Sequence, residues 1–237
     1  PAVKEKNVVV IGGGPAGMQA AIVAAERGHK VTLYEKTGEL GGLLKITDGN
    51  PVKYRLKAYK DYLIRQVKKH AITVRLNTEA TPQMIEAEKP DVVIVATGST
   101  HIIPDIPGVR RANVFTAVEA HRAAGKLGRR VVIVGGNLAG CETALYVRRL
   151  GKEATVVEMT DRLFSDASRI LGNSLQVHLE DDGVRSFTGA RCTEISERGV
   201  HVEFKDGKKE IIPADSVILA VGMKATEETV ASMLSCA

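Results

Sequence analysis

Two stretches of the chain repeat one pattern of apolar and polar positions. "NVVVIGGGPAGMQAAIVAAERGHKVTLYEK" begins at Asn7 and "RVVIVGGNLAGCETALYVRRLGKEATVVEM" begins at Arg130. Each starts with a short apolar run that breaks into glycines, and each continues with apolar residues at helical spacing, a glycine and a second apolar run. Short buried runs that alternate with amphipathic helices are typical of strand–helix–strand units. The pattern therefore predicts two such units with parallel strands.

The repeat extends beyond these two stretches. The pairs separated by 123 positions are Gly12 and Gly135, Gly17 and Gly140, Gly28 and Gly151, and Glu35 and Glu158. A third apolar run, "PDVVIVATGS", returns 124 positions later as "ADSVILAVGM". We expect an α/β chain with two Rossmann-like dinucleotide-binding domains, the second inserted in the first.

The segment "HIIPDIPGVRRANVFTA" contains Pro104 and Pro107 and suits a linker between the domains. A second crossing is expected after Gly222. The predicted boundaries give a first domain of residues 1–106 with 225–237, and a second domain of residues 107–224.

The first unit has a complete dinucleotide fingerprint in Gly12, Gly14 and Gly17. In such a turn the first glycine permits the tight bend, the second lets the backbone approach a pyrophosphate, and the third lets helix and strand pack closely. Glu35 ends the second strand, where a carboxylate accepts hydrogen bonds from a ribose. Glycines that merely relieve crowding at a strand-to-helix turn are the alternative, but the acidic partner favours a nucleotide site.

In the second unit Asn137 replaces the second glycine of the fingerprint. Asparagine is, after glycine, the residue that most readily takes a left-handed backbone, so we expect Asn137 to permit the turn. Its side chain is expected to hinder close approach of a pyrophosphate. Replacing Asn137 with glycine is therefore predicted to leave the fold intact and to tighten dinucleotide binding.

Glu158 predicts which dinucleotide the second unit binds. A carboxylate that accepts hydrogen bonds from a ribose diol repels a 2′-phosphate, so Glu158 favours NADH over NADPH. Arg162 follows shortly after it. Two roles are open for Arg162: contact with a phosphate, or a surface ion pair with Asp161 or Asp166.

Composition and charge add few alternatives. The chain has 237 residues, of which 44% are hydrophobic and 26% are charged, as in ordinary globular proteins. In the densest basic run, Lys53 to His70, the residues Leu56, Tyr59, Leu63 and Val67 lie at helical spacing, so its lysines are expected on the solvated face of a helix. Without a recognition motif, this run predicts no nucleic-acid partner.

Three cysteines, Cys141, Cys192 and Cys236, lie far apart, and neither a CxxC pair nor a Cys/His metal spacing occurs. We expect neither a metal site nor a redox dithiol, and we expect Cys141 to pack in the core. No signal peptide or run of about 20 apolar residues is present, so a cytoplasmic protein without a membrane partner is expected. No Ser/His/Asp or Cys/His set predicts a catalytic side chain.

Together, the two fingerprints, the "GELGG" after the first unit and the "VIVATGS" run resemble the flavoprotein oxidoreductases that have one FAD-type and one NAD-type Rossmann domain. More narrowly, nearly all of the chain resembles the C-terminal portion of the Old Yellow Enzyme-related NADH:flavin oxidoreductases, the dienoyl-CoA reductase and trimethylamine dehydrogenase group. The resemblance implies that NADH passes hydride to FAD. Electrons would then continue through an iron–sulfur cluster to FMN in a barrel domain.

The resemblance also implies cofactor-binding residues. For FAD they are Gly12, Gly14, Pro15, Ala16, Gly17, Glu35, Lys36, Gly41, Gly42, Leu43, Arg55, Ala80, Thr97 and Gly98. For NADH they are Gly135, Asn137, Leu138, Ala139, Gly140, Glu142, Glu158 and Gly222.

The chain departs from this family in two ways. The FAD domain of the family finishes with a strand ending in a Gly-Asp pair and a helix, whereas this chain stops at Ala237, and the barrel and the cluster cysteines are missing. We therefore expect a fragment of a longer polypeptide whose first domain is C-terminally incomplete and binds ADP or AMP, or nothing, instead of FAD. A purified protein that is yellow with FAD would contradict this. His101 stands where the family usually has a proline and is given no role.

Two alternative functions are weighed. A thioredoxin-reductase-like flavoprotein would share both Rossmann units but needs a CxxC near the second, and Cys141 has no such partner. A non-catalytic ADP-binding or nucleotide-binding module would keep the glycines and show no NADH-dependent reduction of dyes.

Overall fold

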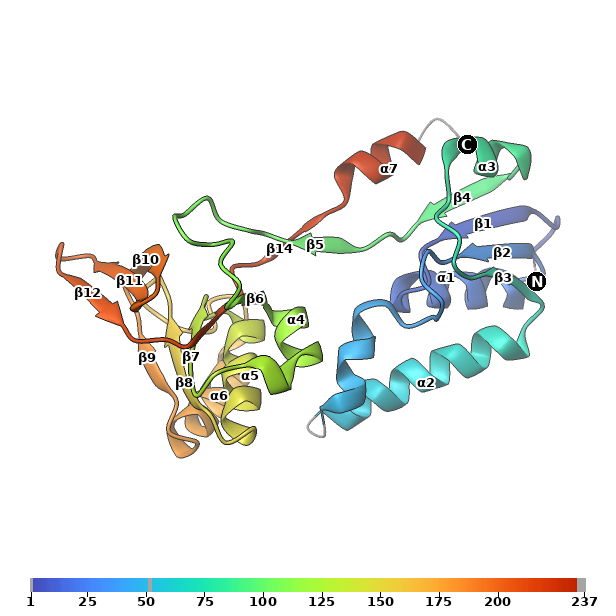
Figure 1. The fold of residues 1–237 in the computed structure, drawn as a ribbon. Helices are drawn as coiled ribbons and strands as arrows, with labels where there is room; N and C mark the ends of the chain where they lie inside the picture. Colours follow the sequence, from blue (N-terminus) through green and yellow to red (C-terminus); the bar gives the residue numbers. More distant parts are fainter. Residues whose placement is uncertain (1, 51–52, 234–237) are drawn as a thin grey trace. The chain divides into compact units, whose positions relative to one another are not determined.

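A computed structural model describes residues 2–50 and 53–233, which form two compact units (Figure 1). Unit 1 comprises residues 1–100 and 225–237, and unit 2 comprises residues 101–224. Unit 2 begins before residue 107 because the N–H of Ile102 donates to the carbonyl of Gly222 at 3.0 Å, and Ile106 packs against the core of unit 2. The two crossing segments, β5 (Ser99–His101) and β14 (Met223–Ala225), pair as a two-stranded sheet.

Unit 1 is a parallel sheet with strand order β3-β2-β1-β4. Its elements are β1 (Asn7–Ile11), α1 (Pro15–Glu26), β2 (Lys30–Tyr34), the 3-10 helix η1 (Gly42–Gly49), α2 (Tyr54–Lys69), β3 (Ile72–Arg75), α3 (Pro82–Ala87), β4 (Val92–Val95) and α7 (Glu227–Met233). One core cluster joins the sheet to α1 and α2 through Val10, Met18, Ile22, Leu63 and Val67.

Helix α2 lies where the basic run predicts a helix, but only its second half has the expected faces. Leu63 and Val67 are buried, whereas Leu56 and Tyr59 remain 43% and 44% exposed. Lys60 was expected on the solvated face and is instead only 7% exposed, paired with Asp48 of η1. The prediction failed here because α2 also packs against η1, whose Asp48 pairs with Lys60.

Unit 2 has a five-stranded parallel sheet with order β6-β13-β7-β8-β9. Its parallel layer consists of β6 (Val114–Thr116), α4 (Ala117–Arg122), the 3-10 helix η3 (Ala124–Lys126), β7 (Arg130–Val134), α5 (Leu138–Arg149), β8 (Glu153–Val157), α6 (Arg169–Asp181), β9 (Arg185–Phe187) and β13 (Ser216–Leu219). An antiparallel sheet adds β10 (Ala190–Ser196), β11 (Gly199–Phe204) and β12 (Lys209–Ile212). Two parallel sheets with crossover helices confirm the predicted α/β fold.

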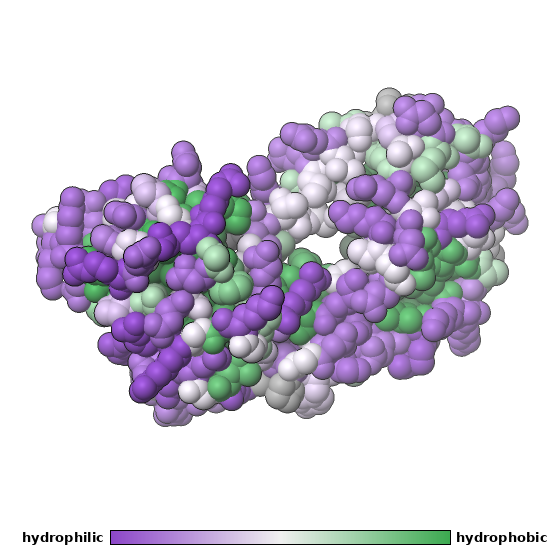
Figure 2. Space-filling view, viewed as in Figure 1, coloured by the Kyte–Doolittle hydropathy of each residue, from purple (hydrophilic) through white to green (hydrophobic). Residues whose placement is uncertain are grey.

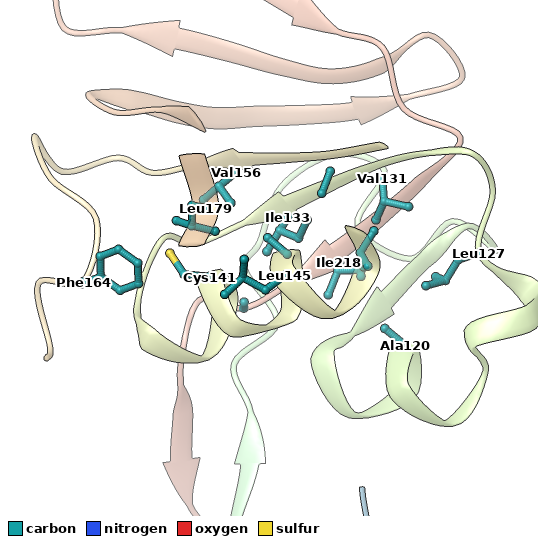
Figure 3. Close-up of a cluster of buried hydrophobic side chains, with 14 residues drawn as sticks. Ala120, Leu127, Val131, Ile133, Cys141, Leu145, Val156, Phe164, Leu179 and Ile218 are labelled. Carbon is teal, nitrogen blue, oxygen red and sulfur yellow. The ribbon is translucent and has the colours of Figure 1, made fainter. Parts of the chain in front are cut away.

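The core of unit 2 lies on both faces of its parallel sheet. On one face, Cys141 and Leu145 of α5 pack with Ile133 and Val156 of the sheet (Figure 3). On the other face, a second cluster joins the sheet to the antiparallel strands β10, β11 and β12. Cys141 is fully buried in this packing, as expected.

The third strand of the repeat is covered differently in the two units. In unit 2, β13 lies between β6 and β7 and all four of its residues are buried. In the described part of unit 1, β4 pairs with β1 alone, and all four of its residues are partly exposed.

Hydrophilic residues cover much of the face drawn in Figure 2, with apolar patches between them. None of the helices in the described segments has the length and apolarity needed to cross a bilayer.

The start of the first strand in each unit is held by an aspartate that directly precedes the third strand of the repeat, which is β4 in unit 1 and β13 in unit 2. Asp91 accepts from the N–H of Asn7 at 2.7 Å, and Asp215 accepts from the N–H of Arg130 at 2.8 Å. Hydrogen bonds from the Arg130 guanidinium hold the pKa of Asp215 below its ordinary value. The repeat seen in the sequence therefore extends to side-chain hydrogen bonds.

Gly140 is predicted to be a glycine of unit 2 that the fold does not tolerate losing. A Cβ at this position would overlap the carbonyl oxygen of Gly135, a backbone atom that cannot move aside. Gly140→Ala is therefore expected to lower the free energy of unfolding by about 1–3 kcal/mol, measured by chemical denaturation.

Gly125→Ala is the matched control, because a Cβ at Gly125 meets no atom within 4 Å. It should leave stability unchanged or raise it by about 0.4–1 kcal/mol. Equal effects of the two substitutions would contradict the packing account.

Candidate functional site

Each unit forms its candidate nucleotide site where the first strand turns into the first helix. The first glycines, Gly12 and Gly135, have φ of 107° and 110°, which L-residues rarely adopt. A Cβ at Gly12 would overlap the carbonyl of Ala96, and a Cβ at Gly135 would overlap the carbonyl of Ala220. Both glycines are required by the fold itself.

The second fingerprint position has an ordinary backbone in both units. Gly14 has φ −74° and ψ −179°, and Asn137 has φ −68° and ψ 177°, which is extended backbone open to any residue. The expectation that Asn137 takes a left-handed conformation is therefore wrong. The positive φ of the turn lies two positions earlier, at Gly12 and Gly135.

Among residues 2–50 and 53–233, no contact requires glycine at position 14. A Cβ there would meet only the Cα of Gly42, at an ordinary 3.9 Å, and Asn137 shows that the same backbone accepts a side chain. No side chain caps α1 at Gly14. The missing side chain therefore leaves space beside the positive end of a helix dipole, the arrangement that suits a phosphate.

In unit 1 the acidic residue of the fingerprint closes the turn from the side of β2. Glu35 is only 8% exposed, and its carboxylate accepts from the N–H of Gly13 and from the N–H and hydroxyl of Thr37, each at 2.8 Å. A Cβ at Gly13 would come within 2.9 Å of the carboxylate and 2.5 Å of Leu40. Gly13 thus lets Glu35 reach the turn.

Unit 2 repeats this arrangement. Glu158, also 8% exposed, accepts from the N–H of Gly136 at 2.6 Å and from the N–H of Thr160 at 2.7 Å. A Cβ at Gly136 would come within 2.5 Å of Leu163. Gly13 and Gly136 were missed because the fingerprint allows any residue there, although the shared glycine in both copies was the signal.

A loop returns to each turn through the same backbone hydrogen bond. The N–H of Gly41 donates to the carbonyl of Gly13 at 2.9 Å, and the N–H of Phe164 donates to that of Gly136 at 2.8 Å. Gly42 follows in unit 1, where a Cβ would come within 2.8 Å of the Cα of Gly14. The structure thus brings Gly41 and Gly42 against the fingerprint of unit 1, with Leu43 42% exposed beside them.

A buried cation lies beside this loop. The side chain of Lys60 would contact a Cβ at Gly41 at 3.0 Å, and its ammonium pairs with Asp48. Arg55, the basic residue marked by the sequence, lies on the exposed face of α2 with its Nε donating to the Tyr54 hydroxyl at 3.0 Å. Sequence reasoning missed Lys60 because helical spacing alone assigned it to solvent.

The remaining FAD-side candidates lie around the carboxyl edge of the unit 1 sheet. Pro15 and Ala16 begin α1, Lys36 is exposed after β2, and Ala80 packs against a small core cluster. The hydroxyls of Thr97 and Thr226 lie 2.6 Å apart, and the N–H of Thr226 donates to the Gly98 carbonyl at 3.4 Å.

In unit 2 two side chains bind the start of α5. Asn137 accepts from the N–H of Gly140 at 2.9 Å and donates to the carbonyl of Ala220 at 2.6 Å. Asp166 accepts from the N–H of Leu138 at 2.9 Å. Ala139 is exposed and Glu142 is partly buried on the same helix.

The other two unit 2 residues considered from the sequence are Gly222 and Arg162. Gly222, with φ 114°, accepts from Ile102 where the chain leaves β13. Of the two roles left open for Arg162, the surface ion pair does not form among the described residues, because Asp161 pairs with Lys205 and Asp166 accepts from a backbone N–H.

Cys141 does not contribute a reactive thiol to this turn. Its sulfur donates to the carbonyl of Gly136 at 3.4 Å. Burial, followed by the charges of Glu158, Asp166 and Glu142, raises its pKa to about 12. The thiol is therefore protonated at neutral pH and fills the core. Cys236 lies outside the described residues.

The chain belongs to the pyridine nucleotide-disulphide oxidoreductase family, whose model matches residues 6–236. It is 41% identical to an NADH oxidase of Thermoanaerobacter brockii over 92% of this chain, and 39% identical to a bilirubin reductase of Mediterraneibacter gnavus over 94%. A solved complex of 2-naphthoyl-CoA reductase superposes with a TM-score of 0.91 and 36% identity over 98% of this chain. The predicted FAD/NAD-binding fold is thereby confirmed.

The chain spans about a third of the length of these relatives. It covers 34% of the NADH oxidase, 35% of the bilirubin reductase and 35% of the 2-naphthoyl-CoA reductase chain.

Asn137→Gly is expected to cost stability, because it removes both hydrogen bonds of the Asn137 side chain. Loss of the cap and of the bond to Ala220 should lower the free energy of unfolding by about 1 kcal/mol, measured by urea denaturation. An unchanged free energy would contradict this account. The sequence-based prediction that the same substitution tightens NADH binding is tested by titrating this variant with NADH.

Proposed function

We propose that the chain is the NADH:flavin oxidoreductase module of a longer, Old Yellow Enzyme-related polypeptide. In this proposal unit 1 binds the ADP portion of FAD and unit 2 binds NADH. NADH supplies a hydride and FAD accepts it. An FMN-containing barrel with an iron–sulfur cluster, elsewhere in the polypeptide, then receives the electrons. The similarity to an NADH oxidase and two reductases supports this proposal. The proposal of a longer polypeptide is supported by the finding that the chain spans only about a third of the length of these relatives.

The observation that most supports nucleotide binding to unit 1 is the glycine at position 14, which the packing of the described residues does not require. The fold needs Gly12, Gly13 and Gly17 for its own close contacts, whereas a Cβ at Gly14 has room. A glycine that the fold does not require, at the start of an uncapped helix, is best explained by close approach of a pyrophosphate. The buried carboxylate of Glu35 provides the acceptor for a ribose hydroxyl.

In unit 2, Glu158 supports binding of NADH rather than NADPH. Its two carboxylate oxygens are fixed by the N–H groups of Gly136 and Thr160, at the end of β8. A fixed negative charge accepts hydrogen bonds from ribose hydroxyls and repels a 2′-phosphate. These side chains bind and orient the cofactors, and no proton transfer from a protein group is required for hydride transfer.

The flavin half of FAD is not provided for as clearly as the ADP half. The turn, Glu35 and the Gly41–Gly42 loop fit a diphosphate and a ribose, while the exposed edge of β4 is where we propose that further residues of the polypeptide pack. We therefore propose that this chain by itself binds ADP more readily than it retains FAD.

Gly14→Ala tests the site in unit 1. The substitution is expected to leave the free energy of unfolding within about 0.5–1 kcal/mol of the parent, because Gly14 has an ordinary backbone and open space. It should weaken ADP binding at least about tenfold in a calorimetric titration, because a methyl group would stand between the backbone and the pyrophosphate.

Gly49→Ala is the control in the same unit, since a Cβ there meets nothing within 4 Å. Equal ADP affinity of the parent and both variants would exclude the proposed site at Gly14.

Dye reduction tests the enzymatic proposal. With added FAD, the protein is expected to reduce an artificial electron acceptor with NADH and much more slowly with NADPH. Glu158→Gln should reduce this preference, because it removes the charge that repels a 2′-phosphate. A protein that binds nucleotides and reduces no acceptor under these conditions would instead be the non-catalytic nucleotide-binding module.

A further inference from the structure

The two fingerprint helices differ in what their first N–H groups contact. At the start of α5, the N–H of Gly140 donates to Asn137 and the N–H of Leu138 donates to Asp166, both at 2.9 Å. At the start of α1, no side chain among the described residues caps the helix. The Asn137 and Asp166 side chains therefore occupy two N–H donors in unit 2, whereas the counterpart of Leu138 in unit 1 is Pro15, which has no N–H.

Asp166 reaches α5 from a loop that has a structural counterpart in unit 1. Both loops are fixed by the same backbone bond, from Gly41 to Gly13 and from Phe164 to Gly136. The residue two positions after this bond is Leu43 in unit 1 and Asp166 in unit 2. The units therefore present an apolar and a negatively charged side chain from equivalent loop positions.

A further negative charge distinguishes the two turns. Glu142 in α5 stands where α1 has Gln19. Buried Cys141, in the first turn of α5, senses three carboxylates, because Glu158, Asp166 and Glu142 all contribute to raising its pKa. A pyrophosphate at α5 would thus face more negative charge than one at α1.

We propose that Asp166 competes with the pyrophosphate of NADH for the N–H of Leu138, and thereby keeps NADH binding to unit 2 weak enough for rapid exchange. This inference rests on the proposed binding of NADH to unit 2. Two anions cannot share one N–H donor without strong repulsion, so NADH binding requires Asp166 to leave. Asp166 is thus a residue that sets affinity, and it does no chemistry.

The side chain of Asp166 has room to move, although its loop is anchored in the core by Phe164. Asp166 itself is exposed. Its neighbours Phe164, Ala167 and Ser168 line a cavity of about 380 Å³ between the loop, α6 and β9. The cap from Ser168 to the N–H of Leu171 is long, at 3.4 Å. Phe164 stays in the core, so Asp166 leaves the N–H of Leu138 by a change of its own exposed side chain rather than by a shift of the whole loop.

Asp166→Asn tests this inference, because the amide keeps the shape and the acceptor oxygen and loses the charge. Calorimetric titration with NADH should give a Kd about two- to fivefold lower than that of the parent. The difference should shrink towards 1 M salt, where charges near the surface are screened. If Asp166→Asn does not fold, as judged by circular dichroism, Asp166→Ser is titrated instead with the same expectation.

Asp181→Asn is the matched control. It removes the same charge from the far end of α6, which ends at Asp181, and should leave the Kd for NADH unchanged. A Kd for the Asp166 variant equal to or higher than that of the parent would overturn the inference. Folded parent and variants that all fail to bind NADH would instead overturn the proposed function of unit 2.

Discussion

The close contact between a helix glycine and a turn carbonyl determines the geometry of both units. The α-carbons of Gly17 and Gly140 lie so near the carbonyls of Gly12 and Gly135 that no side chain fits between them. This contact holds the N-terminus of each helix at the carboxyl edge of its sheet. The Glu35 and Glu158 carboxylates then close the turns from the next strand, and they reach the backbone only because Gly13 and Gly136 have no side chain. The proposed nucleotide sites depend on these contacts.

The repeat has kept the backbone and changed the chemistry at a few positions. Gly14 and Asn137 share one conformation, and the loops to Leu43 and Asp166 begin from the same hydrogen bond. Unit 1 thus presents an open helix N-terminus, whereas unit 2 presents one that is bound by its own side chains. In the proposed function, the same scaffold serves a cofactor that stays and a cosubstrate that exchanges, because the fold is the same in both units and the affinity depends on these side chains.

The sheets of the two units differ in how the third strand of the repeat is covered. The third strand of the repeat has a neighbouring strand on both edges in unit 2, where β13 lies between β6 and β7. Its counterpart β4 has one neighbour among the described strands and leaves four apolar residues partly exposed. Buried parallel strands are apolar because both faces are normally covered. The exposed β4 is therefore the part of unit 1 best suited to contact further polypeptide, in keeping with relatives three times as long.

The sequence alone determined the two strand–helix–strand units, their repeat at 123 positions, the turns at Gly12 and Gly135, and the two acidic residues that end the second strands. These features depend on local periodicity and on residue types with narrow conformational roles, which can be recognised without coordinates. Only the tertiary structure decided that Asn137 is an extended cap, that Lys60 is buried against η1, that Gly13 and Gly136 make room for carboxylates, and that Asp166 binds the start of α5. Each of the last three depends on contacts between segments that the chain brings together only on folding, and the cap conformation depends on where the turn places its positive φ. The spacing of hydrophobic residues predicts neither the contacts between distant segments nor the position of the positive φ in the turn.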